Sequence, residues 1–409
     1  MITDTVDNDF FPPFSRQEIQ QRHRRVRDWM KESGLDCLVV YSAHSLAGND
    51  TGHTNATYLS NYAPCMQGYV VFPLKGEPNL IISHSNHVDN AKDLSVIKDV
   101  RCVGFNIEKG ISDRLKELGL DKGNIGVVGP FSSWFPISMP VEHHTYLTKA
   151  LPGANFKVVT NDYINLTLIK SEEEIEHLQR GAVITDLAHE QIFLATKPGV
   201  RHSDLRRIVA EVANACGGHF PFSHVSSTSM TKPTQSYPDF YPTHRQVQAG
   251  DVVLTELSLG VGIYFGKIYG AFFVGEPTRE YRDMFELAAG VYTSALKELK
   301  PGSTGRDVQR LMQPIEKAGY ASRGYMVGGW STYNQPPHIG RVPASGDPHD
   351  QKSLDFVFKP GHCFTVGVSV VTRDEPDKGL WVGCACTFTR DKLQTLHQYP
   401  VSQLRIITL

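Results

Sequence analysis

Residues 250–275 read GDVVLTELSLGVGIYFGKIYGAFFVG and decide the fold of this chain. The segment is almost entirely apolar, which predicts buried strands. After Asp251 at its start, the charged residues within it are Glu256 and Lys267, which have opposite charges and stand eleven positions apart.

The stretch resembles, without a gap, the metal-binding hairpin of the creatinase/methionine-aminopeptidase ("pita-bread") family, which reads roughly GDLVLIDxGAxYxGYxSDxTRTFxVG. Further landmarks of the creatinase, prolidase and aminopeptidase P branch follow in the right order from about residue 20 to residue 400. They are RVRDWMKESGLDCLVV, NATYLSNYAP, LIKSEEEIEHLQRGAVITDLAH, KPGVRHSDL, PTHRQVQAGDVVL, LKPGSTGRDV and PGHCFTV.

Two domains are expected from the length of the chain and from its pattern. Strands alternate with helices in the first part, which favours an α/β domain over residues 1–168. Ser171 followed by Glu174 is typical of a capping box and predicts a helix from residue 172 to residue 196. An apolar stripe that includes Leu178, Val183 and Ile192 marks its buried face. The resemblance implies a creatinase-type N-terminal domain and a pita-bread domain over residues 169–409, with a curved antiparallel sheet covered by helices.

In the metal-dependent members of the family, two Asp, one His and two Glu hold a pair of divalent cations. On the resemblance, the two Asp positions are Glu256 and Lys267, and the His position is Pro337 with His338 next to it. The two Glu positions are Gly367 and Gly383, or Cys384 in place of Gly383 if the register slips by one residue. A protonated lysine cannot be a ligand. The resemblance therefore implies that the metal site is lost and that no cofactor is needed, while the two glycines leave room for a bulkier substrate.

Glu256 and Lys267 are expected to face one another across the former metal cavity, where opposite charges stabilise each other's ionised forms. Two interpretations stay open. In one, the pair is structural and replaces the charge of the cations. In the other, it is catalytic: Glu256 takes a proton, and Lys267 binds an anion or donates a proton.

Other candidates come from positions that the resemblance places around the cavity. His338 and Asp239 are candidate catalytic residues, and Asp239 stands where the family has a histidine. Capping or core roles remain open for both. Arg341 is a candidate for holding a substrate carboxylate through its bidentate fork. The remaining candidate substrate-binding residues are His219, His224, Tyr264 and Gln67, and Tyr264 also suits a core position.

The composition limits the kinds of partner and the cellular setting that we expect. The formal net charge is −2, with 41 basic and 43 acidic residues, so we expect no nucleic-acid partner. The longest apolar runs are strand-sized, so we expect no membrane span. The seven cysteines are scattered and odd in number, which favours a reducing cytoplasmic setting. The resemblance implies a homodimer in which the N-terminal domain of one protomer, around Gln67, contributes to the pocket of its partner.

Three functions follow. The first is a metal-independent enzyme that acts by acid–base chemistry on a small polar substrate bearing an amine or a carboxylate. Its reaction is C–N bond hydrolysis, elimination, isomerisation or cyclisation. The second is a non-catalytic binding module. The third is a mononuclear metallohydrolase that keeps one ion on Glu256 and His338.

Overall fold

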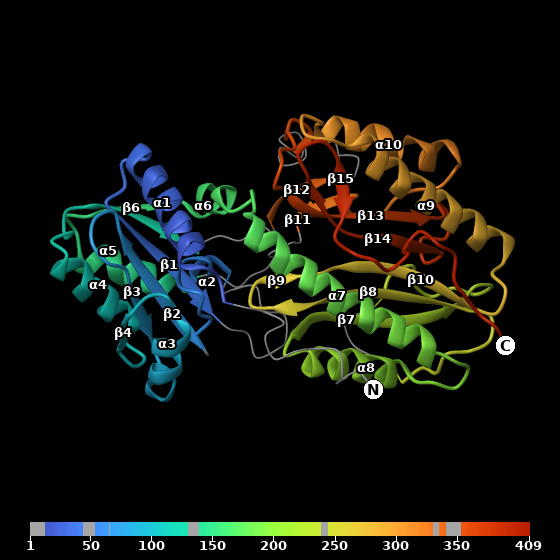
Figure 1. Cartoon of the computed structure of the whole chain (residues 1–409), viewed down its shortest axis with the longest axis horizontal. Helices are drawn as coiled ribbons and strands as arrows, with labels where there is room; N and C mark the ends of the chain where they lie inside the picture. The colour runs from blue at the N-terminus through green and yellow to red at the C-terminus, as the bar shows by residue number, and fades with distance from the viewer. Residues whose placement is uncertain are drawn as a thin grey trace. The chain divides into compact units, whose positions relative to one another are not determined.

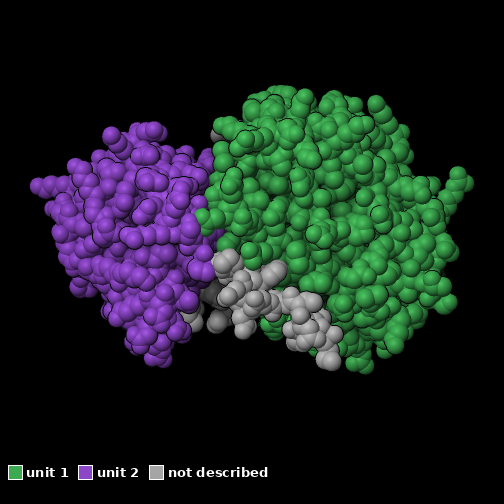
Figure 2. Space-filling model, in the orientation of Figure 1, with its two compact units in different colours: residues 1–12, 169–409 green, residues 13–168 purple. Residues whose placement is uncertain are grey.

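The computed structural model describes residues 13–43, 54–64, 66–129, 139–238, 244–329, 335–340 and 353–409. The chain divides into two compact units (Figure 2). One unit comprises residues 13–168, and the other contains residues 169–409. Among the described residues, no helix combines the length and the apolar character needed to cross a bilayer.

The first unit is an α/β domain built on a six-stranded sheet in the order β4-β3-β2-β1-β5-β6. Its central strand β1 is buried along its whole length. The strand pairs parallel with β5 and antiparallel with β2. Its elements are α1 (Arg16–Glu32), β1 (Cys37–Ala43), α2 (Thr54–Ser60), β2 (Gln67–Pro73), β3 (Asn79–Ile82), η2 (Ser85–His87), α3 (Val88–Leu94), β4 (Asp99–Cys102), α4 (Ile107–Glu117), β5 (Asn124–Val128), α5 (Val141–Ala150), β6 (Asn155–Val158) and α6 (Thr160–Leu166).

The second unit contains a ten-stranded sheet whose main path runs β12-β11-β13-β14-β10-β8-β7. Neighbouring strands along that path are antiparallel. Helices α9 and α10 lie over β13 and β14, whereas α7 and α8 lie against β7 and β8 (Figure 1). The elements are α7 (Glu172–Ala195), α8 (His202–Ala215), β7 (His219–Ser229), β8 (Asp251–Val261), β9 (Tyr264–Phe265), β10 (Ile268–Val274), α9 (Arg279–Glu298), α10 (Gly305–Lys317), β11 (Val327–Gly329), β12 (Gln335–Ile339), β13 (Cys363–Val371), β14 (Gly379–Phe388), β15 (Leu393–Thr395) and β16 (Ile406–Ile407).

Helix α7 begins as its sequence predicts. The Ser171 side chain accepts a hydrogen bond from the Glu174 backbone, and the Glu174 side chain accepts one from Ser171 in return. The apolar stripe is wrong at Val183, which is 38% exposed. The buried face includes Gly181 instead, where an added Cβ would stand 2.8 Å from the Gly266 backbone nitrogen. A residue without a side chain lets α7 pack directly against the backbone of the β8–β10 hairpin.

Two apolar cores flank the large sheet. Leu257 and Phe272 pack in the core that α7 and α8 cover. Val366 and Cys384 pack in the core that α9 and α10 cover. Side chains alternate along a strand, so the residues directly before and after these four core residues point to the other face of the sheet. We call this other face of β8, β10, β13 and β14 the inner face.

Candidate functional site

One row of cross-strand partners crosses the inner face. His224 on β7 is paired with Glu256 on β8, and Glu256 is paired with Tyr269 on β10. Tyr269 is in turn paired with Gly383 on β14, and Gly383 with Gly367 on β13. Directly opposed residues of an antiparallel pair share a face. Positions far apart in the sequence are thereby brought together.

Glu256, which lies in this row, forms a buried ion pair with Lys267, the residue just before β10. Lys267 Nζ donates to Glu256 Oε1 across the hairpin. The Lys267 side chain is 0% exposed and that of Glu256 is 6% exposed, so water does not screen the pair. His224 Nδ1 lies 3.3 Å from Glu256 Oε2 on the other side. One carboxylate therefore stands between a lysine and a histidine.

Burial and charge act against each other on the pair. Burial lowers the pKa of Lys267 to about 8, although the Glu256 carboxylate opposes this fall. Burial alone would raise the pKa of Glu256, but Lys267 and His224 outweigh it, and the pKa of Glu256 is lowered. At neutral pH the pair is accordingly a carboxylate and an ammonium. The ammonium gives up its proton far more easily than an exposed lysine does.

The expectation that Gly367 and Gly383 leave open room is wrong. A Cβ on Gly367 would lie 2.6 Å from Trp381 Nε1 and 2.7 Å from Tyr269 Cδ2. A Cβ on Gly383 would lie 2.0 Å from the Val366 carbonyl oxygen, and the φ angle of Gly383 is +155°. Both positions are closed to any side chain, because aromatic rings fill the space over one and backbone fills the space over the other.

An aromatic series that the sequence did not single out occupies this part of the inner face. The Tyr269 and Trp381 rings stack with centroids 4.4 Å apart and planes 6° apart. Tyr237 packs against the indole at 5.2 Å with a 51° tilt. Lys267 Nζ lies 5.2 Å from the centroid of the Tyr269 ring. The alternation of β14 offers a signal for Trp381, because it stands two residues before Gly383 and shares its face.

His338 lies on the same face, one row away. It is paired with Gly328 on β11, and Gly328 is paired with Thr365 on β13, two residues from Gly367. Its ring packs 4.9 Å from that of Tyr325. Burial lowers the pKa of His338 to about 4, so the imidazole is neutral at physiological pH.

The remaining candidate residues do not join this row. Tyr264 Oη donates to Glu174 Oε1 at the start of α7, over a distance of 3.0 Å. His219 is exposed at the start of β7, where its Nε2 lies 3.3 Å from the Gly262 carbonyl oxygen. Gln67 opens β2 in the other unit. Asp239 and Arg341 lie outside the described residues.

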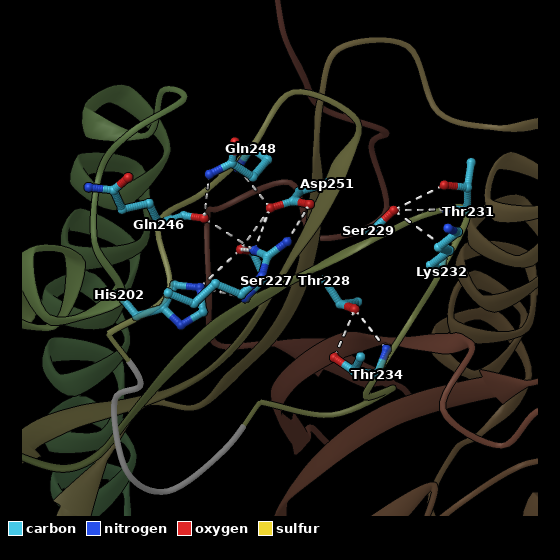
Figure 3. A network of polar contacts seen from close by, with 11 residues as sticks. His202, Ser227, Thr228, Ser229, Thr231, Lys232, Thr234, Gln246, Gln248 and Asp251 are labelled. Carbon is cyan, nitrogen blue, oxygen red and sulfur yellow. Dashed lines mark hydrogen bonds and ion pairs between the residues drawn. The ribbon is translucent and has the colours of Figure 1, made fainter.

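A second polar network joins the start of α8 to the last residues of β7 and to the start of β8 (Figure 3). Ser227 Oγ donates to Asp251 Oδ2 over 3.0 Å, and Arg245 Nη2 donates to Asp251 Oδ1 over 2.8 Å. His202 Nε2 accepts the Ser227 backbone N–H over 3.0 Å. In a catalytic triad the acid orients the histidine, whereas here it holds the serine. His202 Nε2 also lies 2.9 Å from Ser227 Oγ, and the network ties the start of β8 to β7 and to the start of α8.

Comparison with known proteins places the chain in a family. The sequence model of metallopeptidase family M24 matches residues 176–388, and that of the creatinase/prolidase N-terminal domain matches residues 22–166. The chain belongs to metallopeptidase family M24. It is 21% identical to creatinase of Bacillus sp. (strain B-0618) over 325 residues, which cover 74% of this chain and 72% of that protein. It is 23% identical to Xaa-Pro dipeptidase of Pyrococcus furiosus over 299 residues, covering 73% and 78%.

Solved structures show the same fold. The prolidase from Thermococcus sibiricus superposes with a TM-score of 0.78 at 16% sequence identity, covering 96% of this chain and 100% of that one. The X-Pro aminopeptidase from Thermotoga maritima MSB8 superposes with a TM-score of 0.77 at 16% identity, covering 94% and 99%. The predicted fold class, a creatinase-type α/β domain followed by a pita-bread domain, is confirmed.

Proposed function

We propose that this protein is a metal-independent enzyme. It uses Glu256 and Lys267 for acid–base chemistry on a small polar substrate that bears an amine or a carboxylate. The observation that carries the proposal is the buried ion pair itself, at the two hairpin positions where the resemblance expects cation ligands. An ammonium group at such a position repels a divalent cation and occupies the carboxylate that would bind one.

The donor set supports a site without metal. Two cations need several oxygen ligands and a fixed imidazole. Gly367 and Gly383 supply none and have no space for a side chain. Within the described ranges, no group of three or more His, Cys, Asp or Glu side chains is arranged to hold a metal ion. The residues present do not fit the pair of ions that the family name implies.

The chemistry follows from the two pKa shifts, both of which are downward. A general acid works best when its pKa lies near the working pH, and Lys267, at about 8, meets this condition. Lys267 protonates a leaving group or binds a developing anion, and Glu256 then takes the proton that the substrate or water gives up. Because creatinase is among the relatives, C–N bond hydrolysis is the first reaction to test. Elimination, isomerisation and cyclisation use the same two proton transfers.

A non-catalytic binding module is the second candidate. The complete burial of Lys267 favours it, since a lysine that no substrate reaches serves only to hold the hairpin together. A mononuclear metallohydrolase on Glu256 and His338 is less well supported, because Glu256 already accepts from Lys267. The homodimer with Gln67 near the partner's pocket stays part of the proposal, and light scattering tests it.

Metal content and turnover test the proposal together. Protein purified without chelator is analysed for metals. It is then treated with EDTA and incubated with creatine, an alanyl-proline dipeptide and a set of small amides and N-substituted amino acids. We expect far less than one ion per chain and a turnover that EDTA does not change. Near-stoichiometric tightly bound metal would contradict the proposal.

A double variant separates catalysis from structure. Glu256→Gln combined with Lys267→Met removes both charges and keeps similar volumes, so the fold is expected to survive. We expect the double variant to melt like the parent protein and to lose all turnover. If it turned the same compound over at an undiminished rate, the pair would be structural and the catalytic assignment wrong.

A further inference from the structure

Three aromatic rings form a continuous series beside the ion pair. Tyr237 is 37% exposed, Trp381 is half-buried, and Tyr269 is buried at 8%. The rings are in contact in that order, and the last lies against Lys267. We call Tyr237, Trp381 and Tyr269 the aromatic wall. It runs from solvent to the candidate acid–base pair.

The indole of Trp381 is fitted between two glycines. A Cβ on Gly367 would lie 2.6 Å from its Nε1, and a Cβ on Gly324 would lie 2.8 Å from its Cη2. Gly324 has a φ angle of +84°, which disfavours any other residue there. Both ends of the ring system thus depend on the absence of a side chain. The indole of Trp381 therefore has a defined position.

The exposed end of the wall is anchored as well. Ser236 Oγ donates to the Pro376 carbonyl oxygen over 2.7 Å, which ties the segment before Tyr237 to the β13–β14 connection. The Thr234 backbone N–H donates to Thr228 Oγ1 over 2.9 Å (Figure 3). The segment that leads to Tyr237 is thus tied at two points, Thr234 and Ser236.

Among the residues that the structure describes, the indole nitrogen of Trp381 has no acceptor. Trp381 Nε1 is buried, and no hydrogen-bond partner for it is found among the described residues. An indole N–H can only donate. Leaving such a donor buried and unpaired has a real free-energy cost, which a ligand with an acceptor oxygen would remove. The wall thus combines aromatic rings, of which Tyr237 is the most exposed, with one donor that no described residue uses.

We propose that the aromatic wall binds a flat, conjugated part of the ligand that carries an acceptor oxygen, such as an aromatic or unsaturated carboxylate, with Trp381 as the specificity-determining residue. This inference rests on the proposed function, because it takes the inner face as the ligand site. Lys267 and the indole N–H are both donors and both lie against Tyr269, which favours an anionic group over a cationic one. A cation would leave the indole N–H unpaired and would be repelled by Lys267.

The test compares three probes that share a size. Benzoate is flat and anionic, cyclohexanecarboxylate is anionic but not flat, and benzylammonium is aromatic but cationic. Their binding to the full-length protein is measured by calorimetry. A ligand as small as benzoate is expected to bind with about millimolar affinity. We expect cyclohexanecarboxylate and benzylammonium each to bind about tenfold more weakly, because one loses the stacking and the other the acceptor.

Substitutions assign the effect to Trp381. Trp381→Phe keeps a flat ring and removes the N–H, so benzoate binding should fall about tenfold. Trp381→Ala removes the ring and should abolish it. Trp29→Phe is the matched control, because Trp29 lies on α1 in the other unit, and it should leave binding unchanged. Equal binding of benzoate and cyclohexanecarboxylate, no benzoate binding at all, or unchanged binding in a folded Trp381→Phe variant would overturn the inference.

The two proposals fail in different ways. If the Glu256/Lys267 double variant keeps full turnover while benzoate binding depends on Trp381, the acid–base assignment is wrong and the aromatic wall stands. If turnover is lost in the double variant but benzoate binding ignores Trp381, the wall is wrong and the acid–base assignment stands.

Discussion

The two halves of the inner face differ in what occupies the positions where the resemblance expects metal ligands. On β8 and just before β10, Glu256 and Lys267 stand where it expects two aspartates, and they form a buried ion pair. On β13 and β14, Gly367 and Gly383 stand where it expects two glutamates, and neither position has space for a side chain. The first half is charged, whereas the second half is closed by backbone and by the rings of Trp381 and Tyr269.

The difference is physical as well as chemical. A charged half is stable only while both partners are present, since a lone buried charge is very costly. An aromatic half is stable only while its glycines stay glycines, since a packed ring has no space to yield. Substitutions in either half test this difference, and those in the charged half should change the free energy of unfolding more.

The largest effect is expected from removing one charge of the pair. Glu256→Gln leaves the Lys267 ammonium buried without its carboxylate partner and should lower the free energy of unfolding by about 3–5 kcal/mol. The Glu256→Gln/Lys267→Met double variant should lie within about 1 kcal/mol of the parent protein, because no unpaired charge remains. Urea unfolding of both variants measures this. Equal destabilisation of the single and double variants would mean that packing, not charge, decides stability here.

The next effect concerns pH. The pKa of Lys267 is lowered to about 8 in the folded protein, from 10.5 for an unperturbed lysine. Between these two values the unfolded chain binds more protons than the folded one, so stability contributed by this group rises with pH and is flat below about 8. The full rise should reach about 3 kcal/mol. It is measured as the difference between the parent protein and the double variant in urea unfolding at pH 7 to 10. A difference that falls as the pH rises would contradict the assignment.

The sequence predicts much of this fold and half of the site. Local patterns are enough for the capping box of Ser171 and Glu174, and the resemblance to the family's hairpin is enough to single out Glu256 and Lys267. Trp381 and Tyr269 escape such reasoning, because an aromatic residue in a buried strand has the same pattern whether it packs in a core or lines a site. Their role depends on the pairing of β10 with β14, which the register of the folded sheet fixes. Gly367 suggests open space for the same reason, since the ring that fills it comes from another strand.

The smallest effect tests the aromatic half. Gly367→Ala places a methyl group where Trp381 Nε1 and Tyr269 Cδ2 would lie 2.6 and 2.7 Å away, so the stacked rings must shift. The free energy of unfolding should fall by about 1–3 kcal/mol, as expected for overpacking, and the emission of Trp381 should change.

Gly328→Ala is the matched control for this substitution. Gly328 lies on the same face, but its added Cβ would meet Thr365 Oγ1 only at an ordinary 3.5 Å. Its stability should be unchanged or raised by about 0.5 kcal/mol, because alanine restricts the unfolded chain. If both variants lost stability equally, any side chain added on this face would be destabilising. The fit between Gly367 and the indole would then not be specific. If only Gly367→Ala does so, the indole beside Gly367 requires a glycine at this position.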